Sequence, residues 1–134
     1  MSTNCGIALR SGDTYQTIYC HWDGYPKYMF PMLRNNYNSL ELAAKLISYG
    51  DASSIDKKLE PTVKHTLMEP EDGVCVFYHR DRGDDLLQCQ SVCYTRNELF
   101  SQSSFEFIYI FEDSQWNAYN RNGRKLNCGG LYER

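Results

Sequence analysis

The stretch CGIALRSGDTYQTIYCHW, residues 5–22, has the pattern of a β-hairpin and is the starting point for the fold. CGIALR is a short apolar run, SGDT supplies a turn, and YQTIYCHW alternates and is rich in β-branched and aromatic residues. Gly12 and Asp13 both tolerate the positive φ that a tight turn between two strands requires. DGYP at 23–26 is expected to end the second strand, because the residue before Pro26 is pushed away from helix and the sequence cannot continue a ladder.

A second hairpin is predicted near the C-terminal end of the chain. FEFIYIFED (105–113) and QWNAYNR (115–121) are two strand-like runs with a short turn between them. Between the two hairpins, KYMFPMLRNNY (27–37) and SLELAAKLISYG (39–50) carry apolar residues at helical spacing. Two amphipathic helices are therefore expected to follow the first hairpin.

The middle of the chain is predicted to hold a further pair of strands and a short helix. Residues 51–73 are polar and turn-rich, so they read as a long connection with a short strand around VKHTL. VCVFYHR (74–80) is strand-like, and LLQCQSVCY (86–94) is expected to be its returning hairpin partner. TRNELFSQ (95–102) carries a capping-box signature, which indicates a short helix.

The order of these elements predicts an α+β fold, because strands joined by hairpins alternate with helices. We expect an antiparallel sheet built from hairpins, with two or three helices on one face, since hairpin connections exclude a mostly parallel sheet. A length of 134 residues, 42% of them hydrophobic, fits a single domain over residues 1–134. The tail NGRKLNCGGLYER (122–134) is expected to add an edge strand.

The charge balance is mildly acidic, with 14 Lys and Arg against 17 Asp and Glu, a net charge of -3. A general nucleic-acid binder normally has a basic surplus, so no stable nucleic-acid binding is expected. No apolar run approaches the roughly 18 residues of a membrane span, and MSTNCGIALR lacks the apolar stretch of a signal peptide. We therefore expect a soluble cytoplasmic protein with no membrane partner.

The six cysteines are expected to be reduced, because no export signal precedes them. A zinc site would need tighter paired spacing than that of Cys89 and Cys93, which stand four positions apart. We therefore expect no metal and no cofactor. The cysteines are Cys5, Cys20, Cys75, Cys89, Cys93 and Cys128.

Two phrases are richer in functional side chains than folding requires. They are YCHWDGYP (19–26) and YHRDRGDD (78–85). Each contains an H-x-D triplet, in which His21 precedes Asp23 and His79 precedes Asp81. In an extended chain, positions i and i+2 point to the same side, so each histidine can share a face with its aspartate. A carboxylate near an imidazole raises its pKa and orients it, which suits proton transfer or metal binding.

One hypothesis joins the two triplets into a two-histidine phosphodiesterase-like centre, with His21 and His79 as base and acid. That family uses H-x-T or H-x-S, whereas here aspartate stands at the third place, which removes a hydroxyl for a phosphate oxygen and adds negative charge. We therefore favour a protein without catalytic residues. A metal site built from His21, Asp23, His79 and Asp81 is chemically reasonable, but nothing in the spacing requires it.

A second hypothesis is a non-catalytic pocket for a nucleotide. Aromatic rings can stack on a base, arginines can pair with phosphate, and aspartates can accept hydrogen bonds from ribose hydroxyls. The ligand-binding residues would be Trp22, Asp23, Tyr25, Tyr78, Arg80, Asp81 and Arg82, with Asp84, Asp85 and Trp116 as further candidates.

A structural hypothesis stands beside both. The aromatic residues of the first phrase would then pack as a corner against the first helix. The arginines of the second phrase would pair with neighbouring aspartates and fix a loop. An aromatic content of 14% is well explained by a core and by sheet faces.

Three segments resemble a small and largely uncharacterised family of proteins from tailed-phage and prophage genomes. They are IYCHWDGYP (18–26), GDASSI (50–55) and YHRDRGDD (78–85), which carry the YCHWDGYP and YxRDRG motifs. The resemblance runs from about Thr3 to Tyr119. It implies a phage setting, in which small proteins often inhibit host immunity.

The leading expectation is therefore a phage-encoded anti-defence protein that binds and sequesters a nucleotide-derived immune signal in the host bacterial cytoplasm. The first alternative is a protein–protein inhibitor of a CRISPR or other defence complex. The second is a nucleotide-signal phosphodiesterase that uses His21 and His79. The expected partner is thus a nucleotide-type small molecule or a host defence protein, and assembly into a homo-oligomer stays open.

Overall fold

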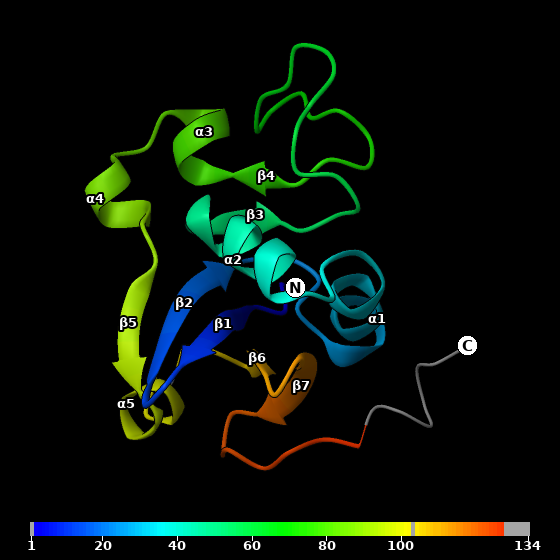
Figure 1. Cartoon of the computed structure of the whole chain (residues 1–134). Coiled ribbons are helices and arrows are strands. Elements are labelled where there is room, and N and C mark those ends of the chain that lie inside the picture. The colour runs from blue at the N-terminus through cyan, green and yellow to red at the C-terminus, as the bar shows by residue number, and fades with distance from the viewer. Residues whose placement is uncertain (1, 103, 128–134) are drawn as a thin grey trace.

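One sheet of seven strands organises the computed structural model, which describes residues 2–102 and 104–127 (Figure 1). Neighbouring strands follow the order β4-β3-β2-β1-β6-β7, and β5 also pairs with β2. The strands are β1 (Cys5–Ser11), β2 (Thr14–Cys20), β3 (Ala52–Ser54), β4 (Val76–Phe77), β5 (Val92–Thr95), β6 (Phe107–Glu112) and β7 (Gln115–Asn120). The helices are α1 (Pro26–Asn36), α2 (Leu40–Ser48), α3 (Tyr78–Arg82), α4 (Leu86–Cys89) and α5 (Arg96–Phe100).

Both predicted terminal hairpins are confirmed. β1 pairs antiparallel with β2, and the turn between them contains Gly12 with a φ of 62°. β6 pairs antiparallel with β7 through a two-residue turn, in which Asp113 and Ser114 both adopt positive φ. Positive φ at both central residues matches the twist of the flanking strands, which is why such turns are favoured in hairpins.

The α+β class is confirmed, but the sheet is mixed and not antiparallel throughout. β6 runs parallel to β1, and β3 runs parallel to β2. β3 follows β2 through α1 and α2, and a crossover of this kind returns the chain in its original direction. The sequence hides β3 inside an apparent connection, because a strand of three residues is too short to show an alternating pattern.

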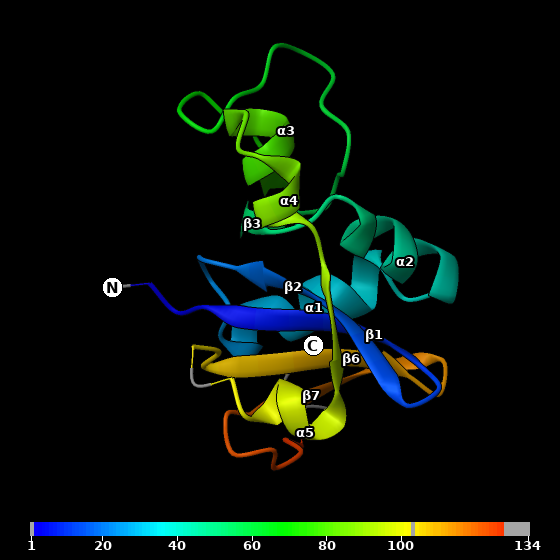
Figure 2. The same cartoon turned by 90° about the vertical axis from the view of Figure 1, so that its left-hand side faces the viewer.

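The two faces of the sheet contribute to separate hydrophobic cores. Ile7, Ile18 and Tyr109 pack with α1 and α2, whereas Ile108 and Ile110 pack with α5. Figure 2 shows α1 and α5 on opposite sides of the sheet. Two helices therefore share one face, as predicted, and α5 covers the opposite face instead of joining them.

The middle of the chain departs most from the sequence-based expectation. In the predicted strand 74–80, only β4 is extended, and α3 begins directly after it at Tyr78. Gly83 follows α3 with a φ of 84°, the left-handed conformation that commonly ends a helix. Residues 63–67 form no strand. Segment 86–94 forms α4 and β5, and β5 pairs with β2 because β3 occupies only the far end of that strand.

The predicted capping box begins α5. The Thr95 hydroxyl oxygen accepts from the Glu98 backbone nitrogen at 3.2 Å, and the Glu98 carboxylate accepts from the Thr95 backbone nitrogen at 2.8 Å.

No helix in the described part of the chain is long and apolar enough to cross a membrane.

The last described residues run back along β7. The Leu126 backbone nitrogen donates to the Ala118 carbonyl at 2.8 Å, and a single bridge joins Tyr119 to Lys125. The rest of the predicted C-terminal edge strand, which includes Cys128, lies outside the described residues.

Gly24 fixes the DGYP turn to the N-terminal segment. Its backbone nitrogen donates to the Thr3 carbonyl at 2.7 Å, and its carbonyl accepts from the Tyr109 hydroxyl at 2.7 Å. A Cβ at this position would lie 2.7 Å from the backbone carbonyl carbon of Asn4, closer than van der Waals contact allows. Only glycine fits at this place without movement of the backbone.

We predict that Gly24→Ala lowers the free energy of unfolding by about 3 kcal/mol, because the new methyl group meets backbone and not a flexible side chain. Gly12→Ala is the matched control, since open space surrounds Gly12 and only its positive φ opposes the change. Its loss should be about 1 kcal/mol. Urea unfolding followed by circular dichroism measures both, and equal losses in the two variants would contradict the steric argument.

Candidate functional site

The segments IYCHWDGYP (18–26), GDASSI (50–55) and YHRDRGDD (78–85) meet at one end of the sheet. The His21 nitrogen donates to the Ala52 carbonyl at 3.1 Å, and the Trp22 nitrogen donates to the Ser53 carbonyl at 3.0 Å. On the other side of β3, the Tyr78 nitrogen donates to the Asp51 carbonyl at 3.2 Å. We call this region the junction. Its residues are Tyr19, His21, Trp22, Asp51, Ser53 and Tyr78.

The first H-x-D triplet does not form a histidine–aspartate pair in the described structure. The Nδ1 atom of His21 is 2.6 Å from the Tyr19 hydroxyl, two residues before it on the same face of the strand. Asp23 lies beyond the end of β2 with a φ of 58° and is exposed to solvent. The spacing rule for extended chains therefore selects Tyr19 as the partner of His21, because the chain stops being extended before Asp23.

The second triplet is divided because it lies on a helix. Each residue of an α-helix turns by about 100°, so positions i and i+2 point to nearly opposite sides. His79 is exposed, and its Nδ1 atom lies 2.7 Å from the Asp84 carbonyl, to which it donates. Asp81 is buried and accepts from the Phe77 backbone nitrogen at 2.8 Å. The predicted pairing of His79 with Asp81 is therefore not formed.

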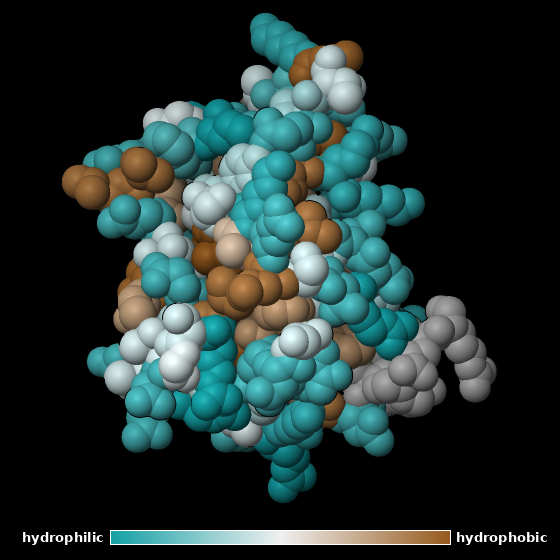
Figure 3. All heavy atoms as spheres, viewed as in Figure 1, coloured by the Kyte–Doolittle hydropathy of each residue, from teal (hydrophilic) through white to brown (hydrophobic). Residues whose placement is uncertain are grey.

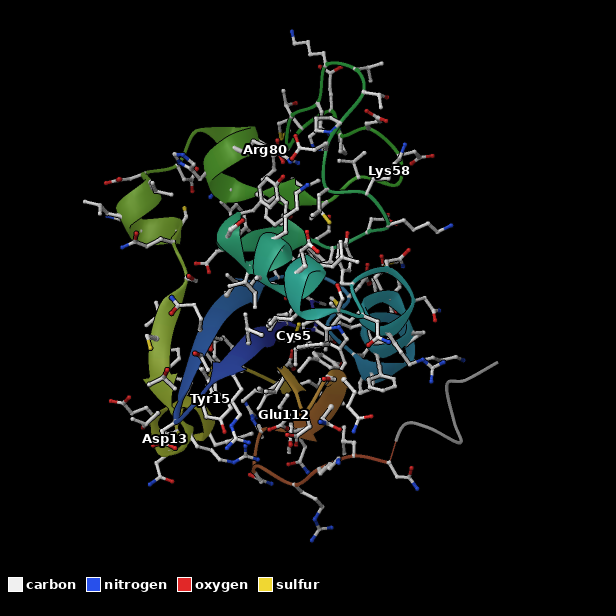
Figure 4. The ribbon with its side chains drawn as sticks, viewed as in Figure 1. Cys5, Asp13, Tyr15, Lys58, Arg80 and Glu112 are labelled. Carbon is white, nitrogen blue, oxygen red and sulfur yellow. The ribbon has the colours of Figure 1, made fainter. Side chains whose placement is uncertain are left out.

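Arg80 and Asp81, both on α3, form a mostly buried ion pair. The Arg80 Nε donates to Asp81 at 2.8 Å, and the rest of the guanidinium donates to the Leu59 and Cys75 carbonyls at 2.5 and 2.9 Å. Its carbon lies 5.1 Å from the centre of the Phe77 ring. In Figure 4, Arg80 lies between α3 and the loop that carries Lys58. These contacts use the guanidinium to fix that loop, which is the structural alternative considered for this phrase.

His65 completes this ion-pair cluster, although its sequence surroundings carry no special signal. Its Nδ1 atom accepts from the Glu71 backbone nitrogen at 2.8 Å, so the proton is on Nε2. The Nε2 atom lies 3.2 Å from the Asp81 carboxylate. Burial alone would raise the pKa of Asp81, but the hydrogen bonds from Arg80 and Phe77 outweigh burial and lower it. The Asp81 carboxylate is therefore charged, and its hydrogen-bond donors come from the protein itself.

The remaining predicted ligand residues lie at the surface. The Arg82 guanidinium lies 4.6 Å from the centre of the Tyr78 ring and pairs with the Asp84 carboxylate at 2.7 and 2.8 Å. Trp22 and Tyr25 are 45% and 39% exposed, which is unusual for aromatic side chains of this size. The exposed members of the predicted set are thus Trp22, Asp23, Tyr25 and Arg82, with Tyr78 half-buried beside them.

Trp116, also considered for stacking, is buried elsewhere in the fold. Its indole nitrogen donates to the Tyr37 carbonyl at 2.9 Å, and its ring packs edge-on against Phe111. It therefore belongs to the core between α1 and the sheet. Asp85 acts at the start of α4, where its carboxylate accepts from the Leu87 backbone nitrogen at 3.1 Å.

Asp51 is a member of the junction that lies outside the predicted set of ligand-binding residues. Its carboxylate accepts from the Tyr19 backbone nitrogen at 2.9 Å. Burial raises the pKa of Asp51 from 3.8 to about 6, and the hydrogen bond from Tyr19 offsets only part of that rise. Burial also raises the pKa values of Tyr19 and Tyr78, so both hydroxyls stay protonated and can donate. The sequence signals for Asp51 are its place in GDASSI (50–55), one of the three segments quoted for the resemblance, and its position directly after Gly50, which ends a helix.

The described residues do not assemble a metal site. Among them, no group of three or more His, Cys, Asp or Glu side chains converges on one point. Of the described cysteines, Cys93 is exposed and the other four are buried as free thiols. The four residues of the metal hypothesis do not come together, because Asp81 belongs to the ion-pair cluster and Asp23 is exposed beyond the end of β2.

We predict that Arg80→Gln lowers the free energy of unfolding by about 2–3 kcal/mol, because the buried Asp81 carboxylate loses its cationic partner and the Leu59 carbonyl loses its donor. Arg82→Gln is the matched control, since Arg82 is exposed and its pairing is at the surface, so little or no stability should be lost. Thermal and urea unfolding measure both variants. Full stability of Arg80→Gln would return Arg80 to the set of ligand-binding candidates.

We predict that Asp51→Asn stabilises the protein near pH 7.5 by about 1 kcal/mol, less than the pKa shift alone implies because Asp51 is only half-buried. The folded-state pKa of about 6 lies above the unfolded value of 3.8, so the stability from protonated Asp51 is complete below pH 3.8 and is lost as the pH rises through 6. Asparagine keeps the acceptor for Tyr19 and carries no charge. Urea unfolding across this pH range should show a growing difference, and a pH-independent difference would contradict the prediction.

Comparison of the chain with protein-family models, with curated proteins and with solved structures finds no match. The functional argument therefore depends on the chemistry of the junction itself.

Proposed function

We propose that the protein binds and sequesters a nucleotide-type small molecule at the junction. The observation that carries this proposal is the exposure of Trp22, a large flat ring held at a rigid turn. The Trp22 backbone is bonded to β3, its ring packs at 4.7 Å against the ring of His21, and Gly24 locks the turn that follows. A ring fixed in this way stacks on a base with little loss of conformational entropy.

Polar groups beside Trp22 suit the rest of a nucleotide. The hydroxyls of Tyr19 and Tyr78 and the ring of His21 can hydrogen-bond to base or ribose edges. Arg82 adds a cation next to Tyr78, where a phosphate could pair with it. In this proposal Arg80 and Asp81 support the site from behind, because they hold α3 against the preceding loop.

The arrangement favours binding over turnover. Within residues 2–102 and 104–127, neither His21 nor His79 is paired with a carboxylate, and the two histidines lie on separate elements, the β2–α1 connection and α3. A general acid and a general base must both reach the reacting atoms. In the phage setting that the resemblance implies, a binder of this kind would act against host defence by removing a nucleotide immune signal.

The second candidate is a protein–protein inhibitor, which exposed apolar side chains on α4 and β5 favour. Leu86, Leu87 and Val92 are 47%, 75% and 48% exposed. Figure 3 shows apolar atoms protruding at the α4 edge of the molecule. Exposed apolar groups that lie together are typical of contact surfaces for other proteins.

A thermal-shift panel of cyclic oligonucleotides and ADP-ribose derivatives tests the first candidate. A true ligand at about 100 times its dissociation constant adds about 2.7 kcal/mol of stability. We expect Trp22→Ala to remove this shift and Arg82→Gln to reduce it, because Arg82 is already paired with Asp84. Leu87→Ala, on the apolar edge, should keep it.

Chromatography of each hit after heat denaturation distinguishes sequestration of the ligand from its hydrolysis. An intact ligand supports sequestration, and a cleaved ligand would replace it with the phosphodiesterase reading. No shift across the panel would reject nucleotide binding at the junction, and a shift that Trp22→Ala leaves intact would reject the junction as its place.

A further inference from the structure

A groove of about 330 Å³ lies between α2 and the loop that follows β3. In Figure 1, α2 lies in front of β3, and Lys58, a lining residue labelled in Figure 4, is on the loop that leaves this strand. None of the residues that line the groove belongs to the junction. The groove is therefore a second, separate feature of the surface.

The groove has an apolar floor between two walls that carry lysines. Tyr37 and Leu59 are the buried members of the lining and form the floor. Leu42 and Lys45 are three residues apart on α2, so they share the face of the helix that forms one wall. Lys57, on the loop after β3, belongs to the other wall.

Hydrogen bonds hold the floor in place. The Tyr37 hydroxyl donates to the Asp56 carbonyl at 2.5 Å, which ties the end of α1 to the loop. The Leu59 carbonyl accepts from the Arg80 guanidinium at 2.5 Å, which ties the same loop to α3. A floor that is already ordered needs little further ordering when a partner binds.

Two of the charged groups that line the groove are balanced within the fold. Lys58 lies 3.5 Å from the Glu71 carboxylate. Glu60 is the acidic residue of the described lining, and its carboxylate lies 3.7 Å from the Arg80 guanidinium. These two residues therefore contribute little net charge to the groove.

The other two lysines of the lining, Lys45 and Lys57, give the groove its positive charge. Both are exposed, and within residues 2–102 and 104–127 neither forms an ion pair. Glu41, one turn before Lys45 on α2, does not reach ion-pair distance of it. The Asp56 carboxylate accepts from the Lys57 backbone nitrogen at 2.8 Å. Against a chain with a net charge of -3, the groove is thus a local positive region.

We propose that this groove docks an acidic segment of a partner protein, in which an apolar side chain lies between two carboxylates. The carboxylates would pair with Lys45 and Lys57 from the two walls, and the apolar side chain would cover Leu42 and the floor. Exposed ion pairs contribute little free energy alone, so the apolar contact is a necessary part of recognition. This surface does not depend on the nucleotide site proposed for the junction.

The lining favours a peptide over a nucleic acid. Tyr37 is the aromatic residue of the described lining, and at 2% exposure its ring offers almost no surface on which a base could stack. A net charge of -3 repels a long polyanion, whereas a short acidic segment brings only two charges to the groove. Leu42 is 41% exposed on the wall, and a peptide side chain can cover it.

Fluorescence anisotropy with labelled hexapeptides tests this proposal. Each peptide carries one leucine between two glutamates, and the spacing of the glutamates varies across the panel. One companion set has glutamine in place of both glutamates, and a second has serine in place of leucine. We expect at least one spacing to bind saturably with a dissociation constant of about 100 μM or tighter at low salt, and to weaken as salt is added.

Substitution of the two lysines tests the role of charge. Lys45→Gln and Lys57→Gln should each weaken peptide binding by roughly threefold, and together by roughly tenfold, as expected for exposed ion pairs. Lys57→Arg keeps the charge and should keep the binding. Lys64→Gln is the matched control, because Lys64 is exposed on the same loop and lies outside the lining.

Substitution of Leu42 tests the role of the apolar wall. Leu42→Ala should weaken binding by roughly fivefold, because apolar surface that the peptide covers is lost. Leu40→Ala is its control, since Leu40 is exposed on α2 outside the lining and should have no effect. All the substituted side chains are exposed, and the melting temperature of each variant shows that it is folded.

A lack of saturable binding by every spacing up to about 1 mM peptide would overturn the proposal. Equal binding by the peptides without leucine, or equal weakening by Lys64→Gln and Lys57→Gln, would also overturn it, because the groove would then respond to charge alone. A dimer in sedimentation that the double lysine variant dissociates would replace the partner protein with a second copy of this chain. No nucleotide is present and no junction residue is changed, so none of these outcomes bears on the junction.

Discussion

The carbonyl groups of β3 hold the whole junction together. Those of Ala52 and Ser53 accept hydrogen bonds from the end of β2, and that of Asp51, which precedes the strand, accepts from the start of α3. Each backbone hydrogen bond adds only about 1 kcal/mol, but together they fix which side chains become neighbours. The strand reaches this place through α1 and α2, and both helices pack on the same sheet face through Leu33 and Leu46. The geometry of the exposed site therefore depends on the buried core that α1 and α2 form with the sheet.

The single turn of α3 divides the residues of YHRDRGDD (78–85) into two groups with different roles. Because α3 is helical, Arg80 and Asp81 turn toward the loop before β4, whereas Tyr78 and Arg82 stack together on another side. The buried ion pair satisfies its own charges through Phe77 and nearby carbonyls, which is the condition under which a buried pair avoids a large desolvation cost. The exposed pair of Arg82 and Asp84 needs no such burial of charge. Arg82 can therefore exchange its carboxylate partner for a ligand at a smaller free-energy cost.

Periodicity predicted the long elements well, and local chemistry decided the rest. The terminal hairpins and the first two helices are long enough for alternating or helical patterns to be visible. β3 and β4 are not, and α3 depends on Gly83, whose left-handed conformation a strand-based interpretation overlooks. At the site, the exposure of Trp22 follows from the turn in which it lies. The sequence gives no comparable indication of the partner of Asp81. His65 lies sixteen residues away in a segment without regular structure, and no spacing rule connects the two.

A phosphate at the junction would meet an ion pair that is already formed. At the junction, Arg82 is already paired with Asp84 through two hydrogen bonds, so the local charge is close to balanced and an incoming phosphate must compete with a carboxylate. Recognition there must rely on the rigid ring of Trp22 and on the hydroxyls beside it, because stacking needs no net charge. Aromatic stacking and neutral hydrogen bonds can thus bind a nucleotide to a chain with a net negative charge, even where the neighbouring cation is already paired.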